Sequence, residues 1–255
     1  MVSFVRAPRV LENPAEVQLT PSQRATVHMA ASLLLDYPAE GTLETRLNAD
    51  EAELATRPAG VAVLLEEFIA QARRRGERAM AEHYVEVFDR RRRCCLYLTY
   101  YTVGDTRHRG AALLAFKQAL AAAGHDMTAD ELPDYLPVVL ELSARSGDEV
   151  AGTLLSSHRE GIEVLRSALA DAASPYAGLV EAVSMTLPQI DEATAERVRA
   201  LVAAGPPTET VGVTNTLPFP TIPVRNPSLS GAPTVPGSAP VADPSPFTSS
   251  QESMT

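Results

Sequence analysis

The sequence predicts an all-α protein built around a single helical domain. Between residues 18 and 204, apolar residues recur at a spacing of three or four, which is the period of an amphipathic helix. Aromatic residues make up only 5% of the chain and alanine is abundant, a composition that favours helices over sheets. The chain has no run of alternating apolar and polar residues and no Asn-Gly or Asp-Gly hairpin turn. We therefore expect a globular bundle of about nine helices.

The composition divides the chain into three parts. We expect residues 1–17 to be a flexible N-terminus, 18–204 to be the helical domain, and 205–255 to be a disordered tail. The last segment holds eleven of the 20 prolines together with many serines and threonines. Such a segment cannot bury enough apolar surface to offset the entropy lost on ordering.

Prolines and turn residues mark the expected helix ends. Thr20 can cap a helix that begins at Pro21, and Tyr37-Pro38 would end that helix. Pro58 and Pro175 are each expected to open another helix. Asp105 can cap a helix that Gly124 ends, apolar stripes cover Met80–Phe88 and Leu154–Leu169, and a last short helix is expected at 192–203.

The charge balance is acidic, with 22 basic and 32 acidic residues and a formal net charge of −10. General nucleic-acid binding needs a basic surface, so this balance argues against it. It suits a basic partner such as a positively charged peptide, and solubility alone would also account for it.

The cysteines and the N-terminus predict a cytoplasmic protein. Cys94 and Cys95 are the only cysteines and are adjacent, so no disulfide framework is expected, which fits a reducing compartment. The first residues lack the apolar run of a signal peptide, and no stretch reaches the roughly 18 apolar residues that span a bilayer.

The usual catalytic motifs are missing from the sequence. It contains no glycine-rich phosphate loop, no G-x-S-x-G, no H-E-x-x-H and no second cysteine pair to complete a zinc site. We therefore expect a binding protein without a metal or a stably bound cofactor, not an enzyme. Two alternatives stay open: a helical enzyme with a closed polar pocket, and a DNA-binding regulator with a basic helix-turn-helix.

The stretch Tyr84–Asp105 is the first candidate for a binding surface. It reads YVEVFDRRRRCCLYLTYYTVGD and holds four of the seven tyrosines. On a helix, Cys94, Tyr97 and Tyr101 would share one face, and tyrosine suits a groove that grips a peptide. Alternatively, the rings belong to the core. We expect the arginines 90–93 to be a solvated helix end, with Glu86 able to pair with Arg90.

The second candidate stretch is 131–145, ELPDYLPVVLELSAR. Asp134 is a plausible N-cap that places Pro137 in the first turn of a helix. Asp134, Glu141 and Arg145 fall roughly along one stripe beside apolar residues, and such a surface can receive a basic amphipathic helix. Alternatively, Asp134 only caps and Glu141 only pairs with Arg145.

Together these stretches resemble a known family. YVEVFDRRRRCCLYLTYYTVGDTRHRGAALLAFKQAL, ELPDYLPVVLELSA and ASLLLDYP are similar to the NarJ or delta-subunit family of nitrate reductase molybdenum-cofactor assembly chaperones, within the TorD-like proteins. The resemblance covers about residues 20–190 and leaves out the proline-rich tail. Related chaperones carry an Asp-His pair where this chain has Asp134-Tyr135, so a role that depends on that histidine does not carry over.

The resemblance implies a chaperone for respiratory nitrate reductase. It implies binding to the apo alpha subunit, through that subunit's N-terminal, twin-arginine-like segment and a second region. The chaperone would keep the subunit competent for insertion of the molybdenum cofactor and delay its docking to the membrane subunit. Molybdenum-cofactor biosynthesis proteins are implied as further partners, and the chaperone would not hold the cofactor stably.

We expect the client's N-terminal segment to bind as an amphipathic helix between the two stretches. Its apolar anchors would be Phe88, Tyr97, Tyr101 and Leu140, and its charge partners Asp89, Asp105, Asp134 and Glu141. The full set of predicted client-binding residues is Tyr84, Phe88, Asp89, Tyr97, Tyr100, Tyr101, Asp105, Asp134, Tyr135, Leu140 and Glu141.

Overall fold

The computed structural model describes residues 11–12, 14–104, 108–125, 131–146, 149–189, 191–193, 196 and 198. All of them belong to one unit, Met1–Val213, and a second unit, Thr214–Thr255, lies outside the described residues. The predicted disordered tail and most of the helix expected at 192–203 also lie outside them.

The described residues form ten α-helices and no β-strand, which confirms the all-α prediction. The helices are α1 (Pro21–Leu35), α2 (Leu43–Ala52), α3 (Ala59–Arg75), α4 (Glu77–Tyr84), α5 (Leu98–Val103), α6 (Arg109–Ala122), α7 (Leu136–Ser146), α8 (Glu149–Ser157), α9 (Arg159–Asp171) and α10 (Tyr176–Met185). In this part of the chain, none of the helices has the length and apolarity needed to cross a lipid bilayer.

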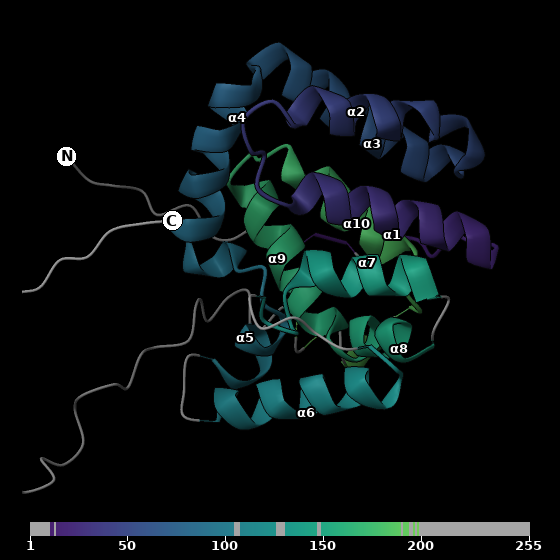
Figure 1. Cartoon of the computed structure of the whole chain (residues 1–255), viewed down its shortest axis with the longest axis vertical. Helices are drawn as coiled ribbons and strands as arrows, with labels where there is room; N and C mark the ends of the chain where they lie inside the picture. The colour runs from purple at the N-terminus through teal and green to yellow at the C-terminus, as the bar shows by residue number, and fades with distance from the viewer. Residues whose placement is uncertain are drawn as a thin grey trace, which may run out of the picture. The chain divides into compact units, whose positions relative to one another are not determined.

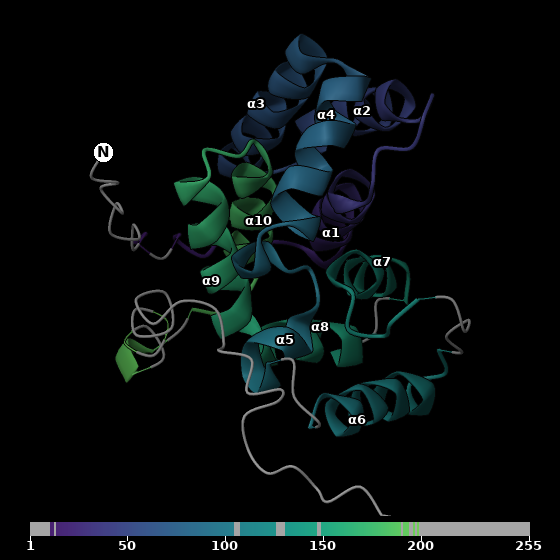
Figure 2. The ribbon, with the colours of Figure 1, turned by 90° about the vertical axis from the view of Figure 1, so that its left-hand side faces the viewer.

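Helices α1, α7, α9 and α10 occupy the middle of the unit, as Figures 1 and 2 show. Helices α2, α3 and α4 lie on one side of them, and α5, α6 and α8 on the other. Helix α1 packs against α7 and α10, and α10 also packs against α3 and α9. The core therefore follows these central helices, and its fully buried residues include Val27, Leu35, Leu65, Leu140, Ile162 and Val183.

Local signals set the start of α1. Thr20 Oγ1 accepts a hydrogen bond from the Gln23 backbone N–H at 3.2 Å, and Gln23 Oε1 accepts one from the Thr20 N–H at 3.1 Å. This capping box contributes about 1 kcal/mol to the helix. Pro21 is the first helical residue and Leu35 the last, so the predicted start at Pro21 and stop before Pro38 are confirmed. The starts predicted after Pro58 and Pro175 are confirmed as well.

The stretch from Tyr84 to Tyr101 is not one regular helix, so the placement of Cys94, Tyr97 and Tyr101 on a single helical face is wrong. Helix α4 ends at Tyr84 and continues as a π-helical turn, Val85–Asp89, whose Arg90 backbone N–H donates to the Val85 carbonyl at 3.2 Å. A short 3-10 turn, Arg92–Cys94, follows. The arginine run therefore lies on irregular backbone and not on a regular helix end.

The cause of this break is a pairing between distant segments. Tyr97 has an extended backbone, φ −95° and ψ 116°, because it forms an isolated antiparallel bridge with Tyr135. Helix α5 starts only at Leu98, so Cys94, Tyr97 and Tyr101 do not share a helical face.

The apolar stripe Leu154–Leu169 is two helices instead of one. Helix α8 ends at Ser157 and α9 begins at Arg159, with His158 between them at ψ 15°. The His158 backbone N–H donates to the Leu154 and Leu155 carbonyls, both at 3.2 Å, a shared bond that is common at helix ends. The bend lets α8 pack against α7 while α9 packs against α10.

Candidate functional site

The two candidate stretches meet along a short backbone pairing. The Leu98 N–H donates to the Asp134 carbonyl at 2.9 Å, and the Leu136 N–H donates to the Leu96 carbonyl at 2.8 Å. The fold therefore brings together the two segments that the sequence singled out.

Asp134 caps a helix, but not the one predicted. Its Oδ2 accepts hydrogen bonds from the Thr99 backbone N–H at 3.1 Å and from the Thr99 hydroxyl at 2.5 Å, so it caps α5 and not α7. The Asp134 residue is 0% exposed. The expectation of an exposed acidic rim at this position is therefore corrected, because the α5 donors already use the carboxylate.

The tyrosines form a cluster that is largely packed. The Tyr84 and Tyr135 hydroxyls are hydrogen bonded at 2.9 Å, and the Tyr97 ring lies 5.3 Å from the Tyr135 ring. The Tyr101 hydroxyl donates to the Arg93 and Cys95 carbonyls at 3.0 and 2.8 Å. Tyr84 and Tyr100 are buried, whereas Tyr97, Tyr101 and Tyr135 are half-buried.

Burial raises the pKa values of this cluster. It raises the pKa of Tyr135 to about 12, and it raises the pKa of Tyr84 and Tyr101 above the usual range of a phenol. Burial also raises the pKa of the Cys94 thiol to about 11. A phenol or thiol is already neutral near pH 7, and these shifts extend the neutral range to higher pH, so the groups serve as hydrogen-bonding or apolar groups.

The remaining predicted residues lie in different environments. Leu140 is completely buried in the core, so it presents no surface in this structure. Phe88 is half-buried against Tyr84, at a ring distance of 4.6 Å, and Asp89 is exposed. Glu141 is partly exposed and pairs with Arg145 at 3.2 Å, as the simpler interpretation expects. Asp105 lies outside the described residues.

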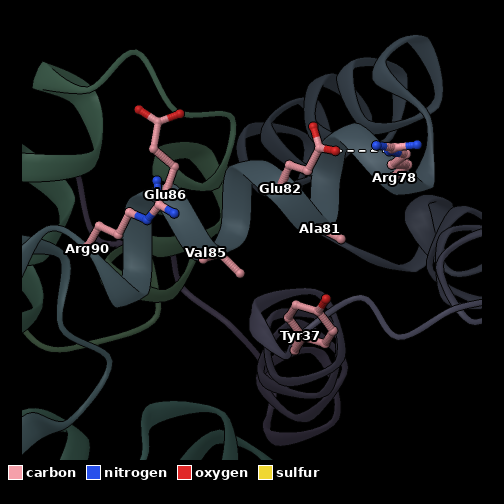
Figure 3. A pocket seen from close by; sticks show the side chains of 7 residues that line it. All are labelled: Tyr37, Arg78, Ala81, Glu82, Val85, Glu86 and Arg90. Carbon is pink, nitrogen blue, oxygen red and sulfur yellow. Dashed lines mark hydrogen bonds and ion pairs between the residues drawn. The ribbon is translucent and has the colours of Figure 1, made fainter.

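A cavity of about 490 Å³ lies beside the tyrosine cluster, between Tyr37 and one face of α4 with its π turn (Figure 3). The exposed Tyr37 ring packs edge-on against Tyr84 at 5.4 Å, which joins the cavity to the cluster. Ala81 and Val85 point toward Tyr37. The lining residues are Tyr37, Arg78, Ala81, Glu82, Val85, Glu86 and Arg90.

Three of the charged lining residues form exposed ion pairs. Arg78 Nε lies 2.9 Å from Glu82 Oε1, and Arg91 Nη2 lies 2.7 Å from Glu86 Oε1. The hydrogen bond from Arg91 lowers the pKa of Glu86. The sequence predicts a pair between Glu86 and Arg90, but Glu86 pairs with Arg91 instead. The reason is the π turn, which brings residues five apart to the same side.

The sequence reasoning missed this cavity. Tyr37 was interpreted only as part of a helix stop, although a tyrosine before a proline can also project from the loop that follows the helix. The spacing of Arg78, Glu82 and Glu86 by four residues was the available signal, since it places all three on one helical face.

The described residues contain no group of three or more His, Cys, Asp or Glu side chains arranged to hold a metal ion. Neither cysteine forms a disulfide. The arrangement of the site is thus an apolar patch made by Tyr37, Ala81 and Val85, with charged side chains around it.

Comparisons with known proteins identify relatives over most of the folded unit. The chain is 40% identical over 182 residues to "Nitrate reductase-like protein NarX" of Mycobacterium tuberculosis (strain ATCC 25618 / H37Rv), a match that covers 71% of this chain and 27% of NarX. The chain thus spans about a quarter of the length of that relative.

A second relative is covered almost completely. The chain is 31% identical over 172 residues to "Probable nitrate reductase molybdenum cofactor assembly chaperone NarJ" of Bacillus subtilis (strain 168), which covers 66% of this chain and 92% of that protein. Residues 51–182 match the family model described as "Nitrate reductase delta subunit". The chain belongs to the nitrate reductase delta subunit family, whose members include this NarJ chaperone.

Proposed function

We propose that this chain is an assembly chaperone for a respiratory nitrate reductase. It binds the apo alpha subunit, including its N-terminal segment, and keeps it competent for molybdenum-cofactor insertion and membrane assembly. The observation that carries this proposal is the match to a probable molybdenum cofactor assembly chaperone over 92% of that protein's length. The all-helical unit and the cavity beside the tyrosine cluster support it.

Several properties belong to the same proposal. The chain acts in the cytoplasm and catalyses no reaction itself. It assists cofactor insertion without holding the cofactor stably. Its partners are the alpha subunit, contacted at the N-terminal segment and at a second region, and the proteins that make the molybdenum cofactor. The acidic balance of the chain, −10 in formal charge, favours a basic client segment.

The cavity at Tyr37 is the docking place that the geometry supports best. Tyr37 is 45% exposed although it is a large aromatic residue, and its ring faces Ala81 and Val85. An apolar side chain of an amphipathic client helix would cover this patch. Phe88 and Asp89 follow in the π turn, but neither lines the cavity, and the Phe88 ring packs against Tyr84 and Tyr176.

Basic client residues would bind by replacing an arginine of this chain in an existing ion pair. The Arg78–Glu82 pair is largely exposed, with side-chain exposures of 93% and 66%, and the Arg91–Glu86 pair is about half exposed. Exposed pairs of this kind contribute about 0–1 kcal/mol each. A client arginine can therefore replace Arg78 at Glu82, or Arg91 at Glu86, at little cost in free energy.

Co-expression of the full chain with the apo alpha subunit tests the proposal. We expect the two to co-purify before cofactor insertion and to separate once the enzyme is mature. An alpha subunit without its N-terminal segment is the matched control and should be retained less. Failure of the full chain to retain any form of the apo subunit would overturn the proposal. Salt-dependent binding of promoter DNA in a gel-shift experiment would instead favour a regulator.

A further inference from the structure

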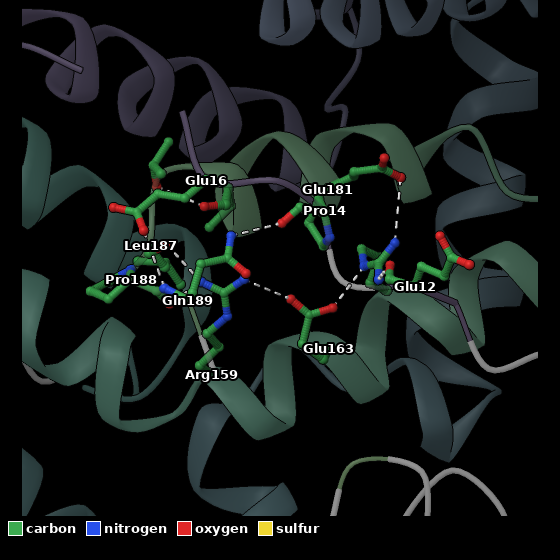
Figure 4. A network of polar contacts seen from close by, with 12 residues as sticks. Glu12, Pro14, Glu16, Arg159, Glu163, Glu181, Leu187, Pro188 and Gln189 are labelled. Carbon is green, nitrogen blue, oxygen red and sulfur yellow. Dashed lines mark hydrogen bonds and ion pairs between the residues drawn. The ribbon is translucent and has the colours of Figure 1, made fainter. Parts of the chain in front are cut away.

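Helix α9 carries a buried cluster of three charged residues, Arg159, Glu163 and Arg166, whose spacing places them along one stripe of the helix. Figure 4 shows Arg159 and Glu163 of this cluster. Their exposed fractions are 3%, 1% and 3%. Removing a charged side chain from water costs free energy, so each of these three side chains needs partners inside the protein.

Glu163 cannot satisfy both arginines alone. Its carboxylate accepts a hydrogen bond from Arg166 Nε at 2.8 Å and one from Arg159 Nη2 at 3.4 Å. A second carboxylate, on the partly exposed Glu181, lies 3.6 Å from Arg166 Nη1. Two guanidinium nitrogens donate to main-chain carbonyls: Arg159 Nη1 donates to Leu187, at 2.7 Å, and to Pro188, whereas Arg166 Nη2 donates to Glu12 at 2.7 Å. The buried Arg159 Nε has no hydrogen-bond partner among the described residues.

Residues 12 and 14–17, here called the N-terminal strap, cover this cluster. They run antiparallel to residues 185–189: the Val17 N–H donates to the Met185 carbonyl at 3.0 Å, and Gln189 Nε2 donates to the Pro14 carbonyl at 3.1 Å. Figure 4 shows the strap residues Glu12, Pro14 and Glu16 around the cluster. These residues fall within the predicted flexible N-terminus, where no sequence motif indicates such bonding.

Recognition of the strap is almost entirely through its main chain. Arg166 and Gln189 bind carbonyls of the strap, and Met185 accepts from a backbone N–H. Among the hydrogen bonds of the described strap residues, one uses a strap side chain toward residues 185–189: Glu16 Oε2 accepts from the Gln189 N–H at 3.3 Å. A site built in this way accepts any extended peptide that offers carbonyls in this register and a carboxylate at the position of Glu16.

The strap is the kind of occupant that can leave. Glu12, Ala15 and Glu16 are exposed, and Pro14 and Val17 are only half-buried, so the strap contributes little to the core. Segments with few buried apolar contacts open at a lower free energy than core helices. Its departure would leave Arg166 Nη2 without the Glu12 carbonyl, and a buried donor without a partner favours a replacement.

We propose that the surface formed by α9 and residues 185–189 is a binding site for an extended, acidic peptide segment of a partner protein, with the N-terminal strap as its internal competitor. The segment supplies main-chain carbonyls to Arg166 and Gln189 and one carboxylate to the Gln189 N–H. This inference does not depend on which client the chaperone serves.

The probe for the test is a fluorescent peptide with the sequence of residues 10–20, and its binding is followed by anisotropy. It should bind a chain that lacks residues 1–17 at least tenfold more tightly than it binds the full chain, where the strap competes. A Glu16→Lys peptide is the matched control and should bind the shortened chain several-fold more weakly. Equal affinity of the probe for the full and shortened chains, or no binding to a folded shortened chain, would overturn the proposal.

A second measurement uses the full chain and covers the case in which the shortened chain does not fold. In hydrogen exchange, excess probe peptide should increase exchange at the Val17 amide while amides of α10 stay protected. Unchanged Val17 protection at saturating peptide would count against an exchangeable strap. A strap from a second copy of this chain could occupy the site instead of a partner protein. Light scattering would then detect dimers, and that result would overturn the proposal of a partner protein.

Discussion

The Asp134 carboxylate caps α5 across a gap of 35 residues, by accepting two hydrogen bonds from Thr99. Asp134 is 0% exposed and Thr99 is 1% exposed, so water cannot replace the carboxylate once it is removed. We expect Asp134→Ala to lower the free energy of unfolding by about 2–3 kcal/mol, measured by urea denaturation. Asp134→Asn retains an acceptor and should lose less.

Asp89→Ala is the matched control for Asp134→Ala, because Asp89 is exposed. Its free energy of unfolding should stay within about 0.5 kcal/mol of the wild type. Equal effects of the two substitutions would show that the capping bond contributes no stability.

Gly161 of α9 lies against the Tyr101 ring. A Cβ added at Gly161 would lie 2.8 Å from the Cβ and Cδ2 atoms of Tyr101, closer than such atoms approach in proteins. We therefore expect Gly161→Ala to lower the free energy of unfolding by about 1–3 kcal/mol, although alanine favours helices. Gly152→Ala in α8 is the control, because nothing lies within 4 Å of its added Cβ. That variant should gain up to about 1 kcal/mol, and a loss at Gly152 as large as that at Gly161 would refute the steric explanation.

His28 should make stability depend on pH. Burial lowers the pKa of His28 from 6.5 to about 4, and its ring nitrogens bond to the Ser143 and Thr186 hydroxyls at 2.9 and 2.8 Å. Between these pH values the unfolded chain binds a proton that the folded chain does not. The folded state is therefore favoured above pH 6.5, and this contribution, about 3 kcal/mol in all, is lost as the pH falls to 4.

The measurement for His28 compares urea denaturation of the wild type and His28→Gln at about pH 7 and about pH 4.5. The variant should lose less stability between the two pH values, because glutamine does not titrate. Carboxylates titrate in both proteins and cancel in the comparison. Identical losses in the two proteins would mean that His28 does not contribute.

Tyr37→Ala should weaken binding of the client's N-terminal segment. Loss of the exposed ring removes most of the apolar patch in the cavity, and truncation of a central anchor costs about 1–3 kcal/mol of binding free energy. Calorimetry with a synthetic peptide of that segment measures the change. Leu114→Ala is the control: Leu114 is 57% exposed and belongs to α6, far from α4 in both Figure 1 and Figure 2.

The Tyr37 experiment also needs a check on the fold, because the Tyr37 ring packs against Tyr84. Denaturation of Tyr37→Ala should still give one cooperative transition near that of the wild type. Unchanged peptide affinity in a folded Tyr37→Ala protein would exclude the cavity as the docking place and leave the chaperone proposal to the co-purification test.

Local chemistry explains which elements could be predicted from the sequence. The start of α1 needs only Thr20, Pro21 and Gln23, all within one helical turn, so the sequence contains the whole signal. The break before α5 depends on the pairing of Tyr97 with Tyr135, which lie 38 positions apart. Periodicity cannot reveal such a pairing, and the helix predicted through Tyr97 was wrong for that reason.

The candidate site shows the same division. Asp134 was interpreted correctly as a cap, but the helix it caps comes from another part of the chain. Leu140 fits an apolar stripe, and a stripe has the same appearance in sequence whether it faces a core or a groove. Tyr37 lies in the cavity because the chain turns after α1 toward α4, a direction set by tertiary packing.

The π turn Val85–Asp89 has a consequence for how this segment tolerates changes in length. In a regular α-helix each residue rotates the chain by about 100°. The π turn closes with a bond between residues five apart, from the Arg90 N–H to the Val85 carbonyl, so it fits one extra residue into about one turn. Deleting one residue from the turn would therefore restore regular winding while later side chains keep nearly their present angle relative to α4. A single-residue deletion should for this reason be tolerated more readily in this turn than inside α4, where it would rotate every later side chain by about 100°.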